Sequence, residues 1–275
     1  MQRFTTLLTL TVALAFGSAA ALADAKTDKR LEESRKVFEA FTDLSEQSVP
    51  AWLLERAYGI VVVPHVIKGA LLVGGRGGRG VLAVRNLDGN WSNPVFVTLA
   101  GGSFGFQWGV QFSDIVLVLM SRKSVEGISG GKIMLGADAS VAAGPLGRSA
   151  SANTDATFKA QVLSYARSEG IFLGVALDGT VISVDDGWNE TAYGVSDILA
   201  SQILEGRITN PPATAREFTA ALTRATHGAE TQEAPAPAAA EKPAVGATPA
   251  APAKDGEPAK TYPMEDPQPG APPPP

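Results

Sequence analysis

The sequence predicts an α+β domain whose core is an antiparallel, barrel-like β-sheet of short strands with N-terminal and C-terminal helices. Three observations carry this prediction: an amphipathic helical pattern comes first, short apolar runs separated by Gly, Pro, Asn and Asp follow, and helical patterns return near the end. Helices before and after a block of strands are typical of the α+β class. With 275 residues, of which 45% are hydrophobic and 19% charged, the chain is long enough to bury a sizeable core.

The first 23 residues have the pattern of a secretory signal peptide. Arg3 gives a positive start, residues 4–20 are apolar, and the small-residue segment 21–23 precedes Asp24 in the manner of a cleavage site. We therefore expect removal of residues 1–23 and a periplasmic or secreted location. Because the sequence has no cysteine, we expect no lipid anchor, no disulfide and no thiolate metal site.

The last 48 residues, 228–275, contain 13 Pro and 13 Ala but no Ile, Leu, Phe or Trp. Such a composition does not bury enough apolar surface to offset chain entropy, so it predicts a disordered Pro/Ala-rich tail. Two interpretations stay open: a solvated tail, or a spacer that reaches a protein partner in the cell envelope. The folded domain is then residues 24–227.

The first element of this domain is predicted to be a helix over Thr27–Leu44. Its apolar residues, which include Leu31, Phe38 and Phe41, fall within an arc of about 140° at 100° per residue. This stripe suits either insertion into a membrane interface or packing on the domain. The polar face is mildly acidic rather than basic, which favours packing.

A short helix over Ser48–Ala57 is expected next, followed by strands. The strands are predicted from apolar runs bounded by turn residues, and the segments Gly74–Gly80 and Asp88-Gly89 are interpreted as hairpin turns between them. The runs are Ile60–Pro64, Ala70–Val73, Val81–Val84, Val95–Leu99 and Ile115–Leu119.

The run Phe104–Phe112 alternates strictly between large apolar residues and Gly or Gln. Its period of two predicts a single strand with Phe104, Phe106, Trp108, Val110 and Phe112 on one face. Either these side chains fill the core, or they line a groove for an acyl chain.

Later elements follow the same rules. Strands are expected at Lys132–Leu135, Gln161–Arg167, Gly170–Leu177 and Thr180–Val184, with a hairpin turn at Asp178-Gly179, and helices at Val195–Leu204 and Ala213–Thr226.

Two glycine-containing motifs have the residue spacing of enzyme signatures but lack the secondary structure that those signatures require. The glycines of segment 75–80 are followed by a strand rather than by the helix that a dinucleotide site needs. The serine motif 101–105 is likewise followed by a strand, whereas a nucleophile elbow leads into a helix. We therefore expect no enzyme, catalytic residue, cofactor or metal. Hydrolysis stays a minor alternative that would depend on Asp114, Asp185 or Asp186.

Charge excludes some partners and suggests others. Residues 24–227 hold 19 Lys and Arg against 21 Asp and Glu, a net charge of 19 − 21 = −2, so nucleic acid is not expected as a partner. Arginines that lie between glycines are suited to binding phosphate oxygens, because the guanidinium group offers several N–H donors and the glycines leave the neighbouring backbone N–H groups exposed. The candidates are Arg76 and Arg79, joined across a hairpin by Lys68 and Arg85; the alternative is a solvated turn.

Several segments together resemble the SYLF domain family. The resemblance covers about residues 45–206, in the family's order. It is carried by Ala57–Pro64, Gly74–Gly80, Asp88–Pro94, Gly109–Asp114, Ala142–Arg148, Ser164–Gly174 and Tyr193-Gly194.

The resemblance implies a lipid-binding domain, in which an amphipathic N-terminal helix and a basic surface contact phosphoinositides. By position that helix is Thr27–Leu44, so Leu31, Phe38 and Phe41 become candidates for insertion. Some members bind actin, a partner that a signal peptide makes unlikely here. We expect a non-enzymatic domain that binds phospholipid peripherally and reversibly, with anionic lipid favoured; the alternative is an envelope scaffold.

Overall fold

The computed structural model describes residues 24–43, 48–70, 73–104, 109–146, 159–168, 171–175 and 177–227. The predicted signal peptide and the predicted tail lie outside these residues. The chain divides into two compact units, Met1–Glu233 and Ala234–Pro275, and every described residue belongs to the first.

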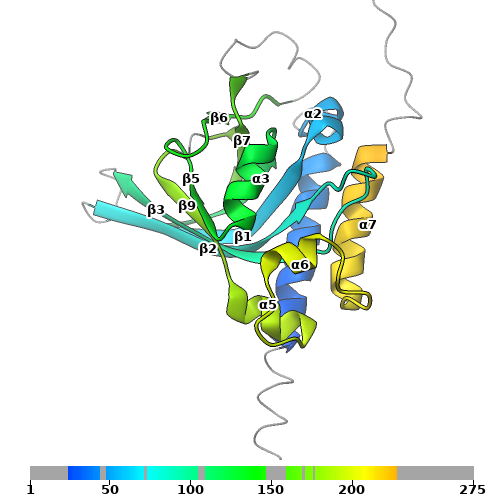
Figure 1. Ribbon diagram of the computed structural model, residues 1–275. Coiled ribbons are helices and arrows are strands. Elements are labelled where there is room, and N and C mark those ends of the chain that lie inside the picture. The colour runs from blue at the N-terminus through cyan, green and yellow to red at the C-terminus, as the bar shows by residue number, and fades with distance from the viewer. Residues whose placement is uncertain are drawn as a thin grey trace, which may run out of the picture. The chain divides into compact units, whose positions relative to one another are not determined.

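The described strands form one sheet of mixed direction (Figure 1). Its order is β5-β9-β3-β2-β1-β4-β7-β6, with β8 also paired to β7, and only β6 and β7 run parallel. The strands are β1 Gly59–Ala70, β2 Val73–Val84, β3 Val95–Phe104, β4 Gly109–Leu119, β5 Lys132–Met134, β6 Val141–Ala143, β7 Val162–Ser168, β8 Ile171–Gly174 and β9 Thr180–Val184.

Helices cover both faces of this sheet. The first helix, residues 24–42, packs on one face with α2 (Ala51–Arg56) and α7 (Ala213–His227), while α3 (Arg122–Ser129) and α6 (Ala200–Leu204) pack on the other. A further helix, α5 (Asp186–Tyr193), follows β9. Within the described part of the chain, no helix combines the length and the hydropathy needed to cross a bilayer. The arrangement confirms the predicted α+β class.

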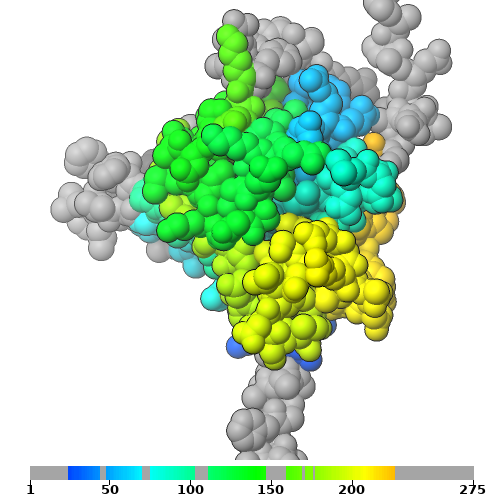
Figure 2. All heavy atoms as spheres, in the orientation of Figure 1, coloured from blue at the N-terminus to red at the C-terminus, as the bar shows by residue number. Residues whose placement is uncertain are grey.

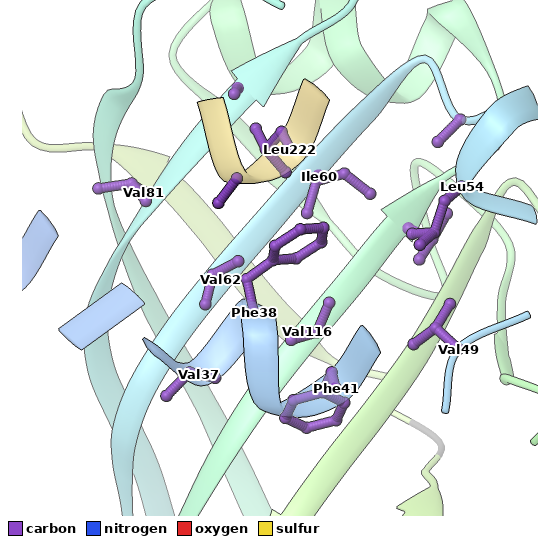
Figure 3. Close-up of a cluster of buried hydrophobic side chains, with 14 of the residues drawn as sticks. Val37, Phe38, Phe41, Val49, Leu54, Ile60, Val62, Val81, Val116 and Leu222 are labelled. Atoms are coloured by element: carbon purple, nitrogen blue, oxygen red, sulfur yellow. The ribbon is translucent and has the colours of Figure 1, made fainter. Parts of the chain in front are cut away.

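The first helix packs its apolar stripe on the domain, as the acidic polar face favoured. Leu31, Phe38 and Phe41 are each 1% exposed. Figure 3 shows Phe38 between its own helix and the β1 residues Ile60 and Val62. Burial of these three side chains accounts for several kcal/mol of stability, at about 1.5–3 kcal/mol each.

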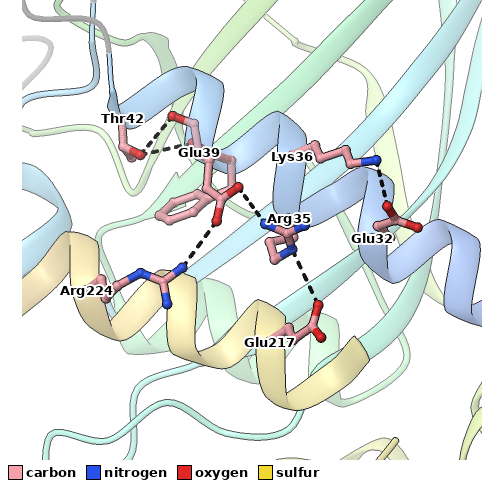
Figure 4. A network of polar contacts seen from close by, with 8 residues as sticks. Glu32, Arg35, Lys36, Glu39, Thr42, Glu217 and Arg224 are labelled. Atoms are coloured by element: carbon pink, nitrogen blue, oxygen red, sulfur yellow. Dashed lines mark hydrogen bonds and ion pairs between the residues drawn. The ribbon is translucent and has the colours of Figure 1, made fainter. Parts of the chain in front are cut away.

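Ion pairs tie the outer side of this helix to α7 (Figure 4). Arg35 lies 2.7 Å from Glu39 and 3.8 Å from Glu217, and Arg224 lies 3.2 Å from Glu39. Such half-exposed pairs contribute about 0–1 kcal/mol each. Apolar burial therefore holds the helix in place, and the charges orient it.

The glycine-arginine segment was predicted to be a turn, and this was wrong: residues 74–80 lie inside β2. Two of these glycines are needed because atoms of β1 leave no room for a side chain. A Cβ on Gly80 would lie 2.0 Å from the carbonyl oxygen of Val62, and one on Gly78 would lie 2.9 Å from the Val63 side chain. Close packing therefore explains Gly78 and Gly80, whereas a Cβ on Gly75 or Gly77 would meet no atom closer than 3.7 Å.

The single strand predicted over Phe104–Phe112 is also wrong. Phe104 ends β3 and Gly109 begins β4, which lie on opposite sides of the β2–β1 pair. Phe112 is 56% exposed rather than buried. Phe106 and Trp108 lie outside the described residues.

The turn predictions have mixed outcomes. Gly89 has φ +86° in the turn between β2 and β3, as predicted. Gly179 has φ +70°, but the strands on either side of it, β8 and β9, pair with other strands, so no hairpin forms. The side chain of Asp185 accepts the Trp188 N–H and caps α5. The helices α3 and α5 were not predicted.

Candidate functional site

The neighbouring strands β3, β2, β1 and β4 share one end of the sheet; strands at this end extend past the helices, to the left in Figure 1. We call this the distal end and define it as residues 67–70 of β1, 73–77 of β2, 101–104 of β3 and 109–112 of β4. The pairs Ala70 with Gly109 and Val73 with Phe104 close its outer edge.

A β-bulge marks where the distal end begins. The pairing of β1 shifts register between Val62 and Ile67, and His65 adopts φ +51° there. The His65 N–H donates to Asp114 Oδ1 at 3.0 Å, and Arg30 Nη1 of the first helix donates to the Pro64 carbonyl at 3.3 Å. The covering helix is thus anchored at the bulge.

Two cations meet on one face of the distal end. Lys68 and Arg76 are direct cross-strand partners of β1 and β2, and Gln111 of β4 faces Lys68 from the other side. Directly opposed residues point to the same face, which here is the face of α3 and α6 because Arg76 and Leu82 share a side of β2. Like charges placed opposite each other are unfavourable. A bound anion would relieve this repulsion.

The Arg76 guanidinium is only partly solvated. Its Nη2 donates weakly to the Gly102 carbonyl at 3.5 Å, and within the described part of the chain its buried Nε has no hydrogen-bond partner. Burial lowers the pKa of Arg76, and the charge of Asp178 partly offsets this. The residue remains charged at neutral pH, so it has unused capacity to bind an anion.

Exposed apolar side chains occupy the opposite face. Ile67 and Phe112 are cross-strand partners and are 49% and 56% exposed. The distal end therefore carries cations on one face and exposed apolar groups on the other, on a part of the sheet that no described helix covers.

Arg79 does not join this pair. It lies three residues from Arg76 and so points to the other face of β2. Its Nε donates to Asp185 Oδ2 at 2.8 Å, and its guanidinium lies 4.9 Å from the centre of the Trp188 ring. Arg79 therefore links β2 to the start of α5.

Arg85 is remote from the distal end. It follows β2 nine residues after Arg76, about 30 Å away along an extended chain. Its Nη2 donates to the Leu54 carbonyl at 3.0 Å, and its guanidinium lies 4.8 Å from the Trp91 ring centre. Burial lowers the pKa of Arg85, an effect that Glu55 opposes. The four predicted cations thus divide into one pair and two separate packing residues.

The predicted insertion residues Leu31, Phe38 and Phe41 lie in the core. In this conformation they do not face solvent, so any contact with lipid would require the first helix to leave the sheet.

The carboxylates considered for catalysis have structural roles where the structure describes them. Asp114 accepts a hydrogen bond from the His65 N–H in the bulge, and Asp185 caps α5 and pairs with Arg79. Asp186 is exposed in the first turn of α5. Among the described residues, no group of three or more His, Cys, Asp or Glu is placed to hold a metal ion.

Sequence reasoning missed the exposure of Ile67 and Phe112 and the partners of Arg79. The predicted apolar run of β1 ended at Pro64, before Ile67, and alternation placed Phe112 on a face expected either to fill the core or to line an acyl-chain groove. No local signal indicates that Asp185 and Trp188, more than 100 residues away, meet Arg79.

Comparisons with known proteins fit this domain. A family model described as "Las17-binding protein actin regulator", Ysc84, matches residues 100–225. The bovine (Bos taurus) "SH3 domain-containing YSC84-like protein 1" is 35% identical over 186 residues, which are 66% of this chain and 54% of the relative. "Protein YSC84" of Saccharomyces cerevisiae is 38% identical over 172 residues, 62% of this chain and 36% of the relative.

The chain spans about half the length of the bovine relative and about a third of the yeast one. The matching family model is named for binding Las17 and for regulating actin. The matched stretch contains most of the strands and helices described above. These similarities identify the chain as a member of the SYLF (Ysc84-type) domain family.

Proposed function

We propose that this chain is a non-enzymatic protein of the cell envelope that binds phospholipid peripherally through the distal end of its sheet. The observation that carries the proposal is the half-buried Lys68–Arg76 pair on one face of the distal end, with exposed Ile67 and Phe112 on the other face of the same strands. The predicted signal peptide supports a periplasmic or secreted location.

The electrostatic part of the attraction comes from Lys68 and Arg76. Each basic residue near an anionic surface contributes about 1 kcal/mol, so the pair gives about 2 kcal/mol. Contact of Ile67 and Phe112 with the interface adds an apolar part. The sum is modest, and we expect reversible binding that weakens as salt shortens the range of the charges.

Co-sedimentation with vesicles tests this proposal. The predicted mature form, residues 24–275, should bind vesicles of equal parts phosphatidylglycerol and phosphatidylcholine and should bind pure phosphatidylcholine weakly. The double variant Lys68→Ala/Arg76→Ala should lose about 30-fold in affinity, which corresponds to about 2 kcal/mol.

The control variant is Lys123→Ala/Lys132→Ala, which removes two exposed cations from α3 and β5 and leaves the distal end intact. Equal loss in both variants would show a dependence on net charge only and would contradict a distal-end site.

A second candidate function is that of an interaction protein. The matching family model and the yeast relative "LAS seventeen-binding protein 3" are named for binding Las17, and residues 228–275 have the composition of a spacer. Deleting residues 228–275 separates the two functions: phospholipid binding should persist, whereas capture of a partner through the tail should be lost.

A further inference from the structure

A groove of about 330 Å³ lies between the beginning of β1, the turn after β2, α3 and α6. Figure 2 shows α3 (green), α6 (yellow) and this turn (cyan) meeting on one face of the molecule. The groove includes Val84 and Arg85, so it lies at the opposite end of β2 from the distal end.

Apolar side chains from three distant parts of the sequence line the groove. Val125 of α3 and Leu204 of α6 are each 7% exposed and, with Val84, form its apolar wall. Tyr58 and Leu87 also line it and are 41% and 89% exposed. Such exposed apolar groups beside a groove favour contact with a second molecule.

Two cations, Arg85 and Arg122, and two carboxylates, Glu126 and Glu205, line the groove. Glu205 lies 3.1 Å from Arg207, and Arg85 donates to the Leu54 carbonyl, so both of these side chains have partners outside the groove. The Arg122 guanidinium lies over the Tyr58 ring, 5.8 Å from its centre. Glu126 follows one turn later on α3, in the order Arg before Glu that pairs less well along a helix. Neither Arg122 nor Glu126 has an ion-pair partner in the part of the chain that the structure describes.

Arg122 and Glu126, one helical turn apart on α3 and without ion-pair partners among the described residues, limit which ligands can bind in the groove. A purely apolar ligand would desolvate Glu126 without compensation, and a ligand with acidic groups but no hydrogen-bond donors would complement Arg122 alone and leave Glu126 without a partner. A peptide presents an apolar side chain, an acidic group and backbone N–H donors within a few residues. Its acidic group complements Arg122, and its N–H donors complement Glu126.

We propose that this groove binds an extended peptide segment in which an acidic residue lies next to an aliphatic or aromatic one. The anchor side chain packs against Val84, Val125 and Leu204. The acidic side chain pairs with Arg122 beside Tyr58. This interaction is independent of the phospholipid function, because the two sites lie at opposite ends of β2.

Selection from a random peptide library displayed on phage, against residues 24–275, tests the proposal. Enriched peptides should share an acidic residue within three positions of a large apolar one. Synthetic versions should bind with micromolar affinity, as the small contact area implies. Arg122→Glu and Leu87→Glu should each weaken the binding at least tenfold, since they replace exposed groups without disturbing the core.

Matched controls are Lys123→Glu, the neighbouring exposed cation on α3, and Leu199→Glu, an exposed leucine that is 60% accessible and does not line the groove. These should change the affinity less than twofold. Absence of enriched peptides, or equal loss in groove and control variants, would overturn the proposal. Loss of vesicle binding but not of peptide binding in the groove variants would also overturn it and assign the groove to the membrane.

Discussion

The two halves of the same four strands differ in what covers them. The inner half consists of residues 59–63 of β1, 80–84 of β2, 95–99 of β3 and 115–119 of β4, and Ile60, Val61, Val62 and Val63 are each 0% exposed. Val66, which follows the bulge residue His65, is still buried at 1% exposure, but the next residues of β1, Ile67 and Lys68, reach solvent where no described helix covers the strand. Whether a residue of these strands is buried therefore depends on whether a helix covers it, not on which strand it belongs to. The bulge marks the point on β1 where this coverage by helices ends. The inner half gives stability and leaves the distal end available for binding.

Truncation of an aromatic side chain should show this difference most strongly. Phe38→Ala removes a core side chain that packs on the inner half and should lower the free energy of unfolding by about 3–5 kcal/mol. Phe112→Ala, in the distal end, should lower it by less than about 1 kcal/mol because the ring is half exposed. Chemical denaturation followed by circular dichroism measures both. Similar losses would contradict the division.

Two glycines of β2 sharpen the comparison. Gly80→Ala places a Cβ 2.0 Å from the Val62 carbonyl oxygen and should destabilise the protein by about 3 kcal/mol. Gly77→Ala meets its nearest atom, the Leu99 carbonyl oxygen, at 3.7 Å. We expect that variant to be neutral or slightly stabilised, because alanine loses less backbone entropy than glycine. Thermal melts of the two variants should therefore move apart; a neutral Gly80→Ala would refute the close-packing explanation.

The two arginines of β2 should also behave differently. Arg79→Ala removes the pair with Asp185 and the contact with Trp188, and should cost about 1 kcal/mol of stability. Arg76→Ala relieves the repulsion with Lys68 and should leave stability nearly unchanged. In vesicle binding the order should reverse, with Arg76→Ala the weaker binder. A destabilised Arg76→Ala with normal vesicle binding would contradict the assignment of Arg76 to the site.

Two tyrosines, Tyr165, which is buried, and Tyr193, which is partly buried, test how completely the inner part is hydrogen-bonded. Within the described part of the chain, the Tyr165 hydroxyl has no partner, whereas that of Tyr193 donates to the Pro94 carbonyl. Tyr165→Phe should therefore raise the free energy of unfolding by about 1 kcal/mol, and Tyr193→Phe should lower it by a similar amount. Urea titrations of the two variants should shift in opposite directions; a shared direction would show that the hydroxyl partners are misassigned.

Burial also raises the pKa of both phenols. The folded protein then keeps these protons to higher pH than the unfolded chain, so the free energy of unfolding should fall as pH rises above about 10. Tyr165→Phe should reduce this slope, which denaturation at a series of alkaline pH values measures. An unchanged slope would exclude Tyr165 as a source of the effect.

Sequence patterns predicted the helices and strands that are determined by the periodicity of neighbouring residues. The amphipathic stripe gave the first helix and its packing, and β-branched runs gave the inner strands, with β9 at the predicted bounds. The glycine-rich segment Gly74–Gly80 was wrongly predicted to be a turn, because glycine is common both in turns and where the backbone is closely packed. Only the structure, which places the Val62 carbonyl against Gly80, shows that close packing applies there.

The candidate site was harder to predict than the fold. Four cations close in sequence suggested one patch, but an extended strand separates Arg76 from Arg85 and turns Arg79 to the other face. Their partners, including Asp178, Asp185 and Leu54, come from distant segments that only the fold brings near. Lys68 and Arg76 were expected to approach each other across a hairpin, but the turn was predicted at Gly74–Gly80, whereas the structure places Arg76 inside β2 and directly opposite Lys68.

The most direct test of the distal-end site uses the absence of native cysteine. An environment-sensitive fluorophore attached to Phe112→Cys reports on the distal end, and the same label on Leu87→Cys, which replaces a side chain 89% exposed, reports on the opposite end of β2. On vesicles of phosphatidylglycerol and phosphatidylcholine, the label at position 112 should shift to the blue and brighten, while the label at position 87 should not change. A response at position 87 alone, or at neither position while the protein co-sediments, would contradict phospholipid binding through the distal end.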